Sequence, residues 1–272
     1  MSICHSTNIA YDRAGPADGE TVVLLHAGIA DRGMWDPQWH AWSASHDVIR
    51  LDLRGFGEST ARPDGRWTTY GDVLDTLSDL DVSRAHLVGC SMGSGVAVEV
   101  ALAGVGIAQS LLLVAPGGPL IAARTPELEQ FIAAENAALE RGDLDAAAEA
   151  NVRWWLDSPR RAATEVDPAV RDRVRAMQRR AFEITEDWED VEEAEDELDP
   201  PALERLAELS VPTLVLLGDL DLDAIHEAAR RCAEEIPAAR LVTWPGTAHL
   251  PSMERPDEFA ALVDGWVGEV SG

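Results

Sequence analysis

The sequence predicts an α/β fold in which a mostly parallel sheet lies between two layers of helices. Short runs rich in Val and Leu recur along the chain without alternation of polar and apolar residues, as in strands that are buried on both faces. Helical patterns separate these runs, and such alternation is typical of three-layer sandwiches with right-handed crossovers. The length of 272 residues suits one large domain better than two independent ones.

The individual elements follow from the same patterns. The predicted strands are an N-terminal edge strand and six buried runs, at 8–13, 21–26, 48–53, 85–90, 111–115, 213–218 and 240–244. The helices expected between and after them lie at 35–44, 69–80, 92–103, 224–235 and 256–267.

Residues 119–209 interrupt this order. They contain no strand-like run and are rich in Ala, Glu, Arg and Leu, which predicts four helices at 126–141, 144–156, 168–185 and 201–209. We therefore expect a core of residues 1–118 and 210–272 that carries 119–209 as an inserted helical cap. The acidic run 183–199 within it is interpreted as a solvated surface segment.

The charge balance excludes several classes of partner. Asp and Glu number 49 against 22 basic residues, all of them Arg, so the formal net charge is -27. Such a field repels nucleic acid and anionic membrane surfaces. The odd set of Cys4, Cys90 and Cys232 has no metal-type spacing and fits a reducing compartment. With no recognisable signal peptide and no apolar run of about 20 residues, a cytoplasmic protein is expected, as monomer or homodimer.

The strongest chemical motif is Gly89-Cys90-Ser91-Met92-Gly93, which follows a predicted strand and opens a predicted helix. A nucleophile on such a sharp turn needs small neighbours two residues away on either side, and both glycines satisfy that need. The helix start places the backbone N–H of Met92 beside the reacting atom. Ser91 is therefore predicted to be a nucleophile, whereas the alternative is a serine that only caps the helix.

Two earlier loops complete the surroundings of this turn. In His26-Ala27-Gly28, after the strand 21–26, the N–H of Gly28 is expected to be the second oxyanion donor, and His26 to hold the loop by hydrogen bonds. After the strand 48–53, Asp52 and Arg54 are expected to pair beneath the site.

An acid and a base are expected after later strands. Gly218-Asp219-Leu220-Asp221 follows one strand, and Asp221 is the preferred acid because it lies further out in the turn; Asp219 more plausibly caps it, and Asp223 is a third candidate. His249 follows the last strand on a short loop that contains glycine, which suits a proton shuttle. The remaining histidines are near the N-terminus, on a strand or on a helix.

With these motifs in order, the chain resembles the α/β-hydrolase superfamily, and in particular its lid-bearing bacterial serine esterases and lactonases. The motifs are His26-Ala27-Gly28 with Trp35 downstream, Asp52-x-Arg54-Gly55-x-Gly57-x-Ser59, Gly89-x-Ser91-Met92-Gly93, Gly218-x-x-Asp221 and Gly246-x-x-His249. Residues 33–38 are also similar to 3-oxoadipate enol-lactonase-like hydrolases. Two residues depart from the family: Ala27 stands where a second glycine is common, and Cys90 where a polar residue is common. We interpret Cys90 as a thiol packed beneath the turn.

The resemblance implies a Ser91–His249–Asp221 triad that cleaves a small carboxylic ester or lactone through an acyl-enzyme, without cofactor or metal. Trp35, Trp154 and Trp155 are candidates to line the substrate pocket. Alternatives that stay open are carbon–carbon bond hydrolysis, acyl transfer or perhydrolysis by the same triad, and a ligand-binding member of the fold without catalysis. Three arginines of the predicted cap are expected either to bind a substrate carboxylate or to pair with acidic residues: Arg153, Arg160 and Arg161.

Overall fold

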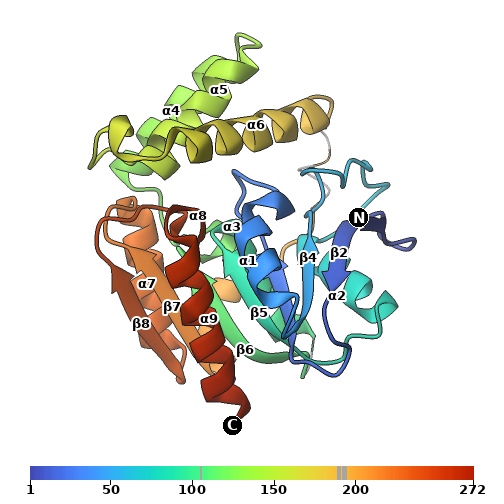
Figure 1. Cartoon of the computed structure of the whole chain (residues 1–272). Helices are drawn as coiled ribbons and strands as arrows, with labels where there is room; N and C mark the ends of the chain where they lie inside the picture. Colours follow the sequence, from blue (N-terminus) through green and yellow to red (C-terminus); the bar gives the residue numbers. More distant parts are fainter. Residues whose placement is uncertain (105, 189–190, 192–194) are drawn as a thin grey trace.

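The computed structural model describes residues 1–104, 106–188, 191 and 195–272. A single sheet of eight strands runs through it in the order β1-β2-β4-β3-β5-β6-β7-β8 (Figure 1). The strands are β1 (Ser2–Ile3), β2 (Ala10–Ala14), β3 (Thr21–Leu25), β4 (Asp47–Leu51), β5 (Ala85–Cys90), β6 (Ala108–Val114), β7 (Thr213–Gly218) and β8 (Ala239–Trp244). β1 and β2 pair antiparallel to their neighbours, and every other pairing is parallel. The predicted α/β sandwich is confirmed.

Helices cover both faces of this sheet because its central strands are apolar on both sides. The helices of the core are α1 (Asp36–Trp42), α2 (Thr69–Asp79), α3 (Met92–Ala103), α7 (Asp223–Glu235), α8 (Pro251–Glu254) and α9 (Pro256–Ser271). α1 packs against α9, and α2 packs against α3. β3 and β5 through β7 are almost entirely buried between these layers, as expected for unalternating apolar runs.

The strand order has a topological switch point at the centre of the sheet. β3 pairs with β4 on one side and with β5 on the other. After β4, the chain therefore crosses over β3 to form β5 on the opposite side. Ligands of open α/β sheets bind outside the carboxyl ends of the strands at such a switch point. The loops that follow β3 and β5 carry His26-Ala27-Gly28 and Ser91.

The N-terminal prediction needs a small correction. The predicted strand 8–13 corresponds to β2, but β2 is not the edge of the sheet because the short β1 pairs along its outer side. Two backbone hydrogen bonds between Cys4 and the loop that joins the two strands help to close this hairpin, from Cys4 N–H to Ile9 O (2.8 Å) and from Asn8 N–H to Cys4 O (2.9 Å).

Between β6 and β7 the described residues form helices and turns, apart from one isolated β-bridge between Glu195 and Trp67. These helices and turns are α4 (Pro126–Leu139), α5 (Leu144–Asn151), the π-helical turn η3 (Val152–Asp157), α6 (Pro168–Thr185) and four 3-10 turns, η2 (Gly118–Leu120), η4 (Ala163–Glu165), η6 (Ala202–Glu204) and η7 (Leu206–Glu208). α4, α5 and α6 lie beyond the carboxyl ends of the strands (Figure 1). We call residues 119–209 the helical insertion.

For two helices of this insertion, the predicted extent is wrong. The predicted helix 201–209 consists of the two short turns η6 and η7, which meet at Arg205, whose φ of -116° lies outside the helical range. In place of the predicted helix 144–156, the α-helix α5 ends at Asn151, and the chain continues as the π-helical turn η3. Of the acidic run 183–199, residues 189–190 and 192–194 lie outside the described residues.

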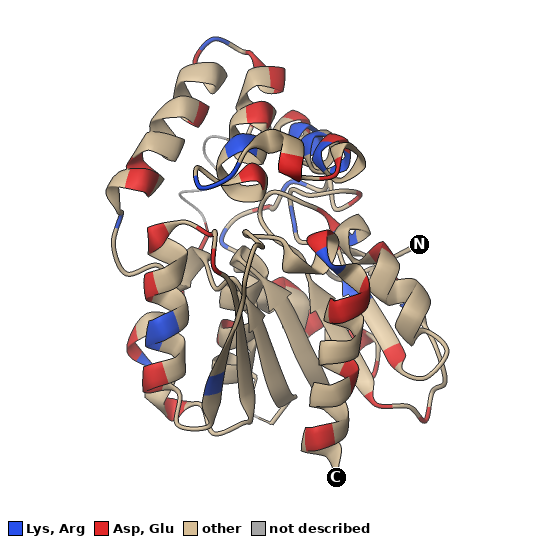
Figure 2. Ribbon diagram, turned by 60° about the vertical axis from the view of Figure 1, so that its left-hand side comes forward, with Lys and Arg blue, Asp and Glu red and all other residues tan. Residues whose placement is uncertain are grey.

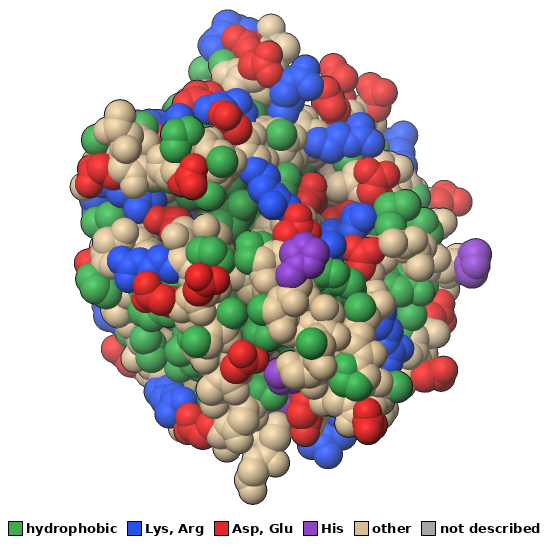
Figure 3. All heavy atoms as spheres, viewed as in Figure 1, with side chains coloured by type: hydrophobic (Ala, Val, Ile, Leu, Met, Phe, Trp, Pro, Cys, Tyr) green, Lys and Arg blue, Asp and Glu red, His purple; other side chains and the backbone are tan. Residues whose placement is uncertain are grey.

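Charges are distributed unevenly over these parts. Acidic residues occur throughout the fold, whereas arginines gather on the insertion and on α6 in particular (Figure 2). On the face seen in Figure 3, red and blue side chains are interspersed, so that face carries no large patch of one sign. In the part of the chain that the structure describes, no helix has the length and apolar character needed to cross a membrane.

Candidate active site

Ser91 lies at the sharpest turn of the core, between the end of β5 and the start of α3. Its backbone has φ 54° and ψ -117°, a conformation that L-residues rarely adopt and that costs about 1–3 kcal/mol. A Cβ on Gly89 would collide with the carbonyl oxygen of Gly93, and a Cβ on Gly93 would collide with that of Leu25. Both glycines of the motif are therefore required by close backbone approach, and the turn holds Ser91 at the carboxyl edge of the sheet.

Asp221 and His249 form a buried pair at the same edge. Their side chains are about 1% exposed or less, and His249 Nδ1 lies 2.8 Å from Asp221 Oδ2. The other carboxylate oxygen of Asp221 accepts the backbone N–H of Leu222 at 2.8 Å. Both oxygens of the acid are thus occupied, and the imidazole is fixed with Nδ1 toward the carboxylate, which leaves Nε2 for a substrate or a nucleophile.

The serine turn and the histidine loop are in contact through Cys90. Its thiol points to the carbonyl oxygen of His249, with 3.7 Å between sulfur and oxygen. Burial is the main cause that raises the pKa of Cys90 well above its ordinary value, so the thiol stays protonated. Within the described residues, Ser91 Oγ donates no hydrogen bond to His249; such contacts often tighten only when substrate is bound.

The two rival acids have other roles. Asp219 Oδ1 accepts the backbone N–H of Gly246 at 2.7 Å, so this carboxylate ties the loop after β7 to the loop after β8. Asp223 stands at the first position of α7 and pairs with Arg160 at 2.6 Å. Neither carboxylate is bonded to His249, which agrees with the preference for Asp221.

Gly28 and Met92, whose backbone N–H groups are the predicted oxyanion donors, lie close together. A Cβ on Gly28 would lie 3.6 Å from the Met92 sulfur, so the loop after β3 and the start of α3 are adjacent. Among the described residues, neither N–H has a hydrogen-bond acceptor in the protein. Gly117, which the sequence motifs do not single out, lies against Ser91: a Cβ there would be 2.9 Å from Ser91 Oγ. The one signal for this contact in the sequence is that Gly117 follows a strand, β6, as Ser91 follows β5.

His26 holds its loop by hydrogen bonds, as predicted. Its Nε2 accepts the N–H of Leu53 at 2.9 Å, and its Nδ1 donates to the carbonyl oxygen of Ala27 at 2.8 Å. Burial lowers the pKa of His26, so the imidazole stays neutral and can act in this way.

The predicted pairing of Asp52 with Arg54 is wrong. Asp52 instead accepts the backbone N–H groups of Arg32 and Glu58, both at 2.8 Å, and pairs with the Arg32 guanidinium. Arg54 points the other way and binds Asp72 of α2 with two nitrogens, at 2.6 and 2.7 Å. Residues two apart around the turn diverge because each side chain has a nearer partner from another element.

The three tryptophans proposed to line a pocket differ sharply. Trp35 is completely buried and packs on Phe259 of α9, with 5.8 Å between ring centroids, so it belongs to the core and the structure does not support it as a pocket residue. Trp154 is partly buried against the core. Trp155 lies over His249, with ring centroids 4.4 Å apart, and its carbonyl oxygen accepts the His249 N–H at 3.3 Å.

The arginines proposed to bind a substrate carboxylate are already engaged within the protein. Arg160 pairs with Glu127 and Asp223, and Arg161 pairs with Glu254 at 2.6 Å. Arg153 donates to the carbonyl oxygen of Ser158 at 2.7 Å. Arg160 and Arg161 thus match the alternative expectation of pairing with acidic residues, whereas Arg153 binds a backbone carbonyl oxygen instead. In the described parts of the chain, no group of three or more His, Cys, Asp or Glu is arranged to hold a metal ion.

Comparison with known proteins gives the class that this fold and site define. The Alpha/beta hydrolase family matches residues 22–262, and the chain belongs to that family. It is similar to 3-oxoadipate enol-lactonase 1 of Acinetobacter baylyi, which is 25% identical over 94% of this chain and 91% of the relative. An inferred carbamate hydrolase, RutD, of Azorhizobium caulinodans is 30% identical over 96% of this chain and 98% of its own length. The solved structure of the enol-lactonase from Burkholderia xenovorans superimposes with a TM-score of 0.77 and 26% identity, covering 97% of this chain and 98% of that one.

Proposed function

We propose that the protein is a serine hydrolase that cleaves a small carboxylic ester or lactone through an acyl-enzyme. The single observation that carries the proposal is the buried pair of Asp221 and His249, 2.8 Å apart, at the sheet edge where Ser91 stands on its strained turn. The names of the relatives supply the substrate class, since an enol-lactonase opens a cyclic ester.

In this mechanism, Ser91 Oγ attacks the carbonyl carbon while His249 Nε2 accepts its proton. Asp221 stabilises the imidazolium through Nδ1–H and does not itself take up the proton. The oxyanion accepts the N–H groups of Met92 and Gly28, and each such donor contributes about 10²–10³ in rate.

Collapse of the tetrahedral intermediate completes the acylation. His249 gives its proton to the departing alkoxide or enolate oxygen, and the acyl group stays on Ser91. A water molecule then loses a proton to His249 as it attacks the acyl-enzyme. The acid leaves, the proton returns to Ser91 Oγ, and the site is restored.

The helical insertion is proposed to act as the cap of this site. The hydroxyl of Ser158 donates to the carbonyl oxygen of Leu220, next to Asp221, and Arg161 donates to the carbonyl oxygen of Gly246 at 3.2 Å. Trp155 lies on His249 itself. The segment that follows α5 therefore contacts both the acid loop and the base loop, and shields them from water.

A covalent probe tests the nucleophile. Incubation with a fluorophosphonate is expected to add one phosphonyl group to the wild-type protein, which intact mass and peptide mapping would locate on Ser91. Ser91→Ala should lose the adduct and reduce hydrolysis of p-nitrophenyl esters by about 10⁴-fold or more. Ser83→Ala is the matched control, because Ser83 is exposed and lies on the turn before β5 at the opposite end of that strand.

Two results would overturn the proposal. Labelling at a serine other than Ser91 would reject the nucleophile. A wild-type protein with neither label nor hydrolysis of esters and lactones would instead favour a ligand-binding role for the fold.

A further inference from the structure

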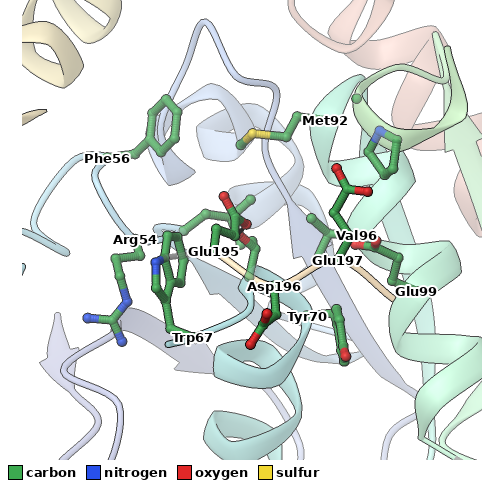
Figure 4. A pocket seen from close by; sticks show the side chains of 14 residues that line it. Arg54, Phe56, Trp67, Tyr70, Met92, Val96, Glu99, Glu195, Asp196 and Glu197 are labelled. Atoms are coloured by element: carbon green, nitrogen blue, oxygen red, sulfur yellow. Dashed lines mark hydrogen bonds between the residues drawn. The ribbon is translucent and has the colours of Figure 1, made fainter. Parts of the chain in front are cut away.

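A cavity of about 430 Å³ lies along α3. Its lining includes Met92, which follows Ser91 in the chain, and Gly118, which follows Gly117. Val96 and Glu99 continue the same wall, since residues 92, 96 and 99 share one face of a helix. The volume lies in the range of small-molecule sites. The cavity therefore extends along α3 from Met92, the neighbour of Ser91, to Glu99 (Figure 4).

Glu99 is the exceptional side chain of this cavity. The residue is only 8% exposed, yet among the described residues its carboxylate has neither a hydrogen-bond donor nor a cationic partner. The four other buried carboxylates of the described chain all pair with Arg or His: Asp47, Asp52, Asp157 and Asp221. A buried charge without a partner is costly, so the fold tolerates at Glu99 what it avoids elsewhere.

The carboxylates that surround Glu99 further disfavour its charged form. Glu195 and Glu197 line the same cavity, and they add to the effect of burial in raising the pKa of Glu99 to about 7. Asp196 also lines the cavity and pairs outward with Arg66 at 2.8 Å. The carboxylates thus outnumber the cations on this wall.

Among the described residues that line the cavity, the one cation, Arg54, is already neutralised. Arg54 binds both oxygens of Asp72, and its guanidinium lies 5.5 Å from the ring of Trp67. Trp67, Tyr70 and Phe56 supply aromatic walls (Figure 4). Aromatic faces next to carboxylates are the surroundings that organic ammonium groups prefer.

We propose that this cavity binds an organic ammonium group of the substrate, with Glu99 as its buried counter-ion and the aromatic side chains as its walls. The inference rests on the proposed function and specifies its substrate class: an ester or lactone that carries a cationic amine. Eight residues of helix separate Ser91 from Glu99, so the amine lies on the order of 10 Å from the carbonyl carbon. A bare metal ion fits less well, because the described residues offer no group of three metal-ligating side chains.

The same charges disfavour an anionic substrate. A carboxylate tail placed in this cavity would meet Glu99, Glu195 and Glu197 and no unpaired cation of the described chain. The substrate is therefore expected to differ in charge from a lactone that carries a free carboxylate.

A pair of isosteric substrates tests the proposal. The p-nitrophenyl esters of 8-(trimethylammonio)octanoate and 9,9-dimethyldecanoate have nearly the same shape and differ by one charge, and their chains can span the distance of about 10 Å between the carbonyl carbon and the amine. The wild-type protein is expected to show a kcat/KM about tenfold higher or more for the cationic ester, with the difference mainly in KM. Glu99→Gln should bring the ratio close to one while turnover of the neutral ester is retained. Glu204→Gln, an exposed residue on η6 outside the cavity, makes the same change in net charge and should keep the wild-type ratio.

Binding without catalysis separates this inference from the proposed function. Calorimetry of Ser91→Ala with tetramethylammonium should show binding that the double variant with Glu99→Gln has lost. A wild-type preference for the neutral ester, or an equal preference in wild type and Glu99→Gln, would overturn the ammonium site. If Ser91 is still labelled by the fluorophosphonate in that case, the hydrolase proposal stands alone.

Discussion

The two sides of the reacting centre are built on opposite electrostatic principles. On the side of His249 and Asp221, both carboxylate oxygens and the imidazole Nδ1 have partners, and Trp155 of the helical insertion packs on the imidazole. On the side of α3, the cavity is lined by carboxylates, and Glu99 is buried without any partner among the described residues. The charges on the first side are paired within the protein, whereas the buried carboxylate on the second side gains a partner only when a cationic ligand binds.

This difference separates chemistry from recognition. Catalytic groups gain from being held in position in advance, because reorganisation during the reaction adds to the barrier. A recognition site that is left with an unpaired charge gains selectivity instead, since only a ligand of opposite sign removes the cost of burial. The predictions below test each side in turn.

The largest expected effect comes from the acid. Asp221→Asn keeps the shape of the side chain but removes the charge that stabilises the imidazolium, and it should lower kcat by about 10³–10⁴-fold. Asp219→Asn is the matched control: its carboxylate binds Gly246 N–H and not His249, so activity should stay within a few-fold of wild type. Steady-state kinetics on an aryl ester measures both. Equal losses in the two variants would mean that the acid has been assigned to the wrong residue.

Next in size is the contact between the insertion and the base. Trp155 is 8% exposed and touches both His249 and Phe131, so Trp155→Ala should lower the free energy of unfolding by about 3 kcal/mol and kcat by roughly tenfold. Trp155→Phe keeps an aromatic ring and should recover most of kcat. Denaturant unfolding and kinetics give the two values. If kcat were unchanged in Trp155→Ala, the insertion would not shield the base.

An effect on stability of at most the same size is expected from Glu99 on the recognition side. Its pKa rises from 4.5 in the unfolded chain to about 7 in the folded protein, so the folded state binds the proton more tightly. Stability from the neutral carboxyl is present below pH 4.5 and is lost as the pH rises through 7, by up to about 3 kcal/mol. Glu99→Gln should therefore stabilise the ligand-free protein at pH 8 relative to wild type.

Unfolding of both proteins across pH 5 to 8 checks this sign. The wild-type protein should lose stability relative to Glu99→Gln as the pH rises over this range. A parallel course of the two curves would show that the Glu99 carboxylate is not held at a cost, and it would remove the contrast between the two sides.

The smallest effect is expected from Cys90. Because burial keeps the pKa of its thiol high, alkylating reagents at neutral pH should leave the folded protein active and unmodified at this residue. Peptide mass mapping after treatment with iodoacetamide measures the modification. Rapid alkylation of Cys90 with loss of activity would mean that the catalytic side opens more readily than its contacts suggest.

Much of the catalytic side was predictable from the chain alone. Ser91, Asp221 and His249 each follow a strand, and parallel strands bring their carboxyl ends to one edge, so order along the chain translates into proximity in space. The glycines around Ser91 follow from the same logic, because a tight turn leaves no room for a side chain. Periodicity likewise located the strands and most helices within a few residues.

The recognition side was not predictable in this way. Glu99 sits in an otherwise apolar helix, and its burial follows from the packing of α3 against α2 and from residues 195–197, almost one hundred positions later. Trp35 looked like a pocket residue because it follows the oxyanion loop, yet α9 covers it. Arg54 pairs with Asp72 of α2 and not with Asp52, because the folded chain brings the Asp72 carboxylate within hydrogen-bond distance of its guanidinium.

The sequence by itself therefore determined the class of fold and the order of the chemical groups, since both depend on local periodicity and on where strands end. Only the tertiary structure decided which charges are paired. Pairing depends on distances between segments far apart in the chain, and on which side chains are cut off from water when those segments pack.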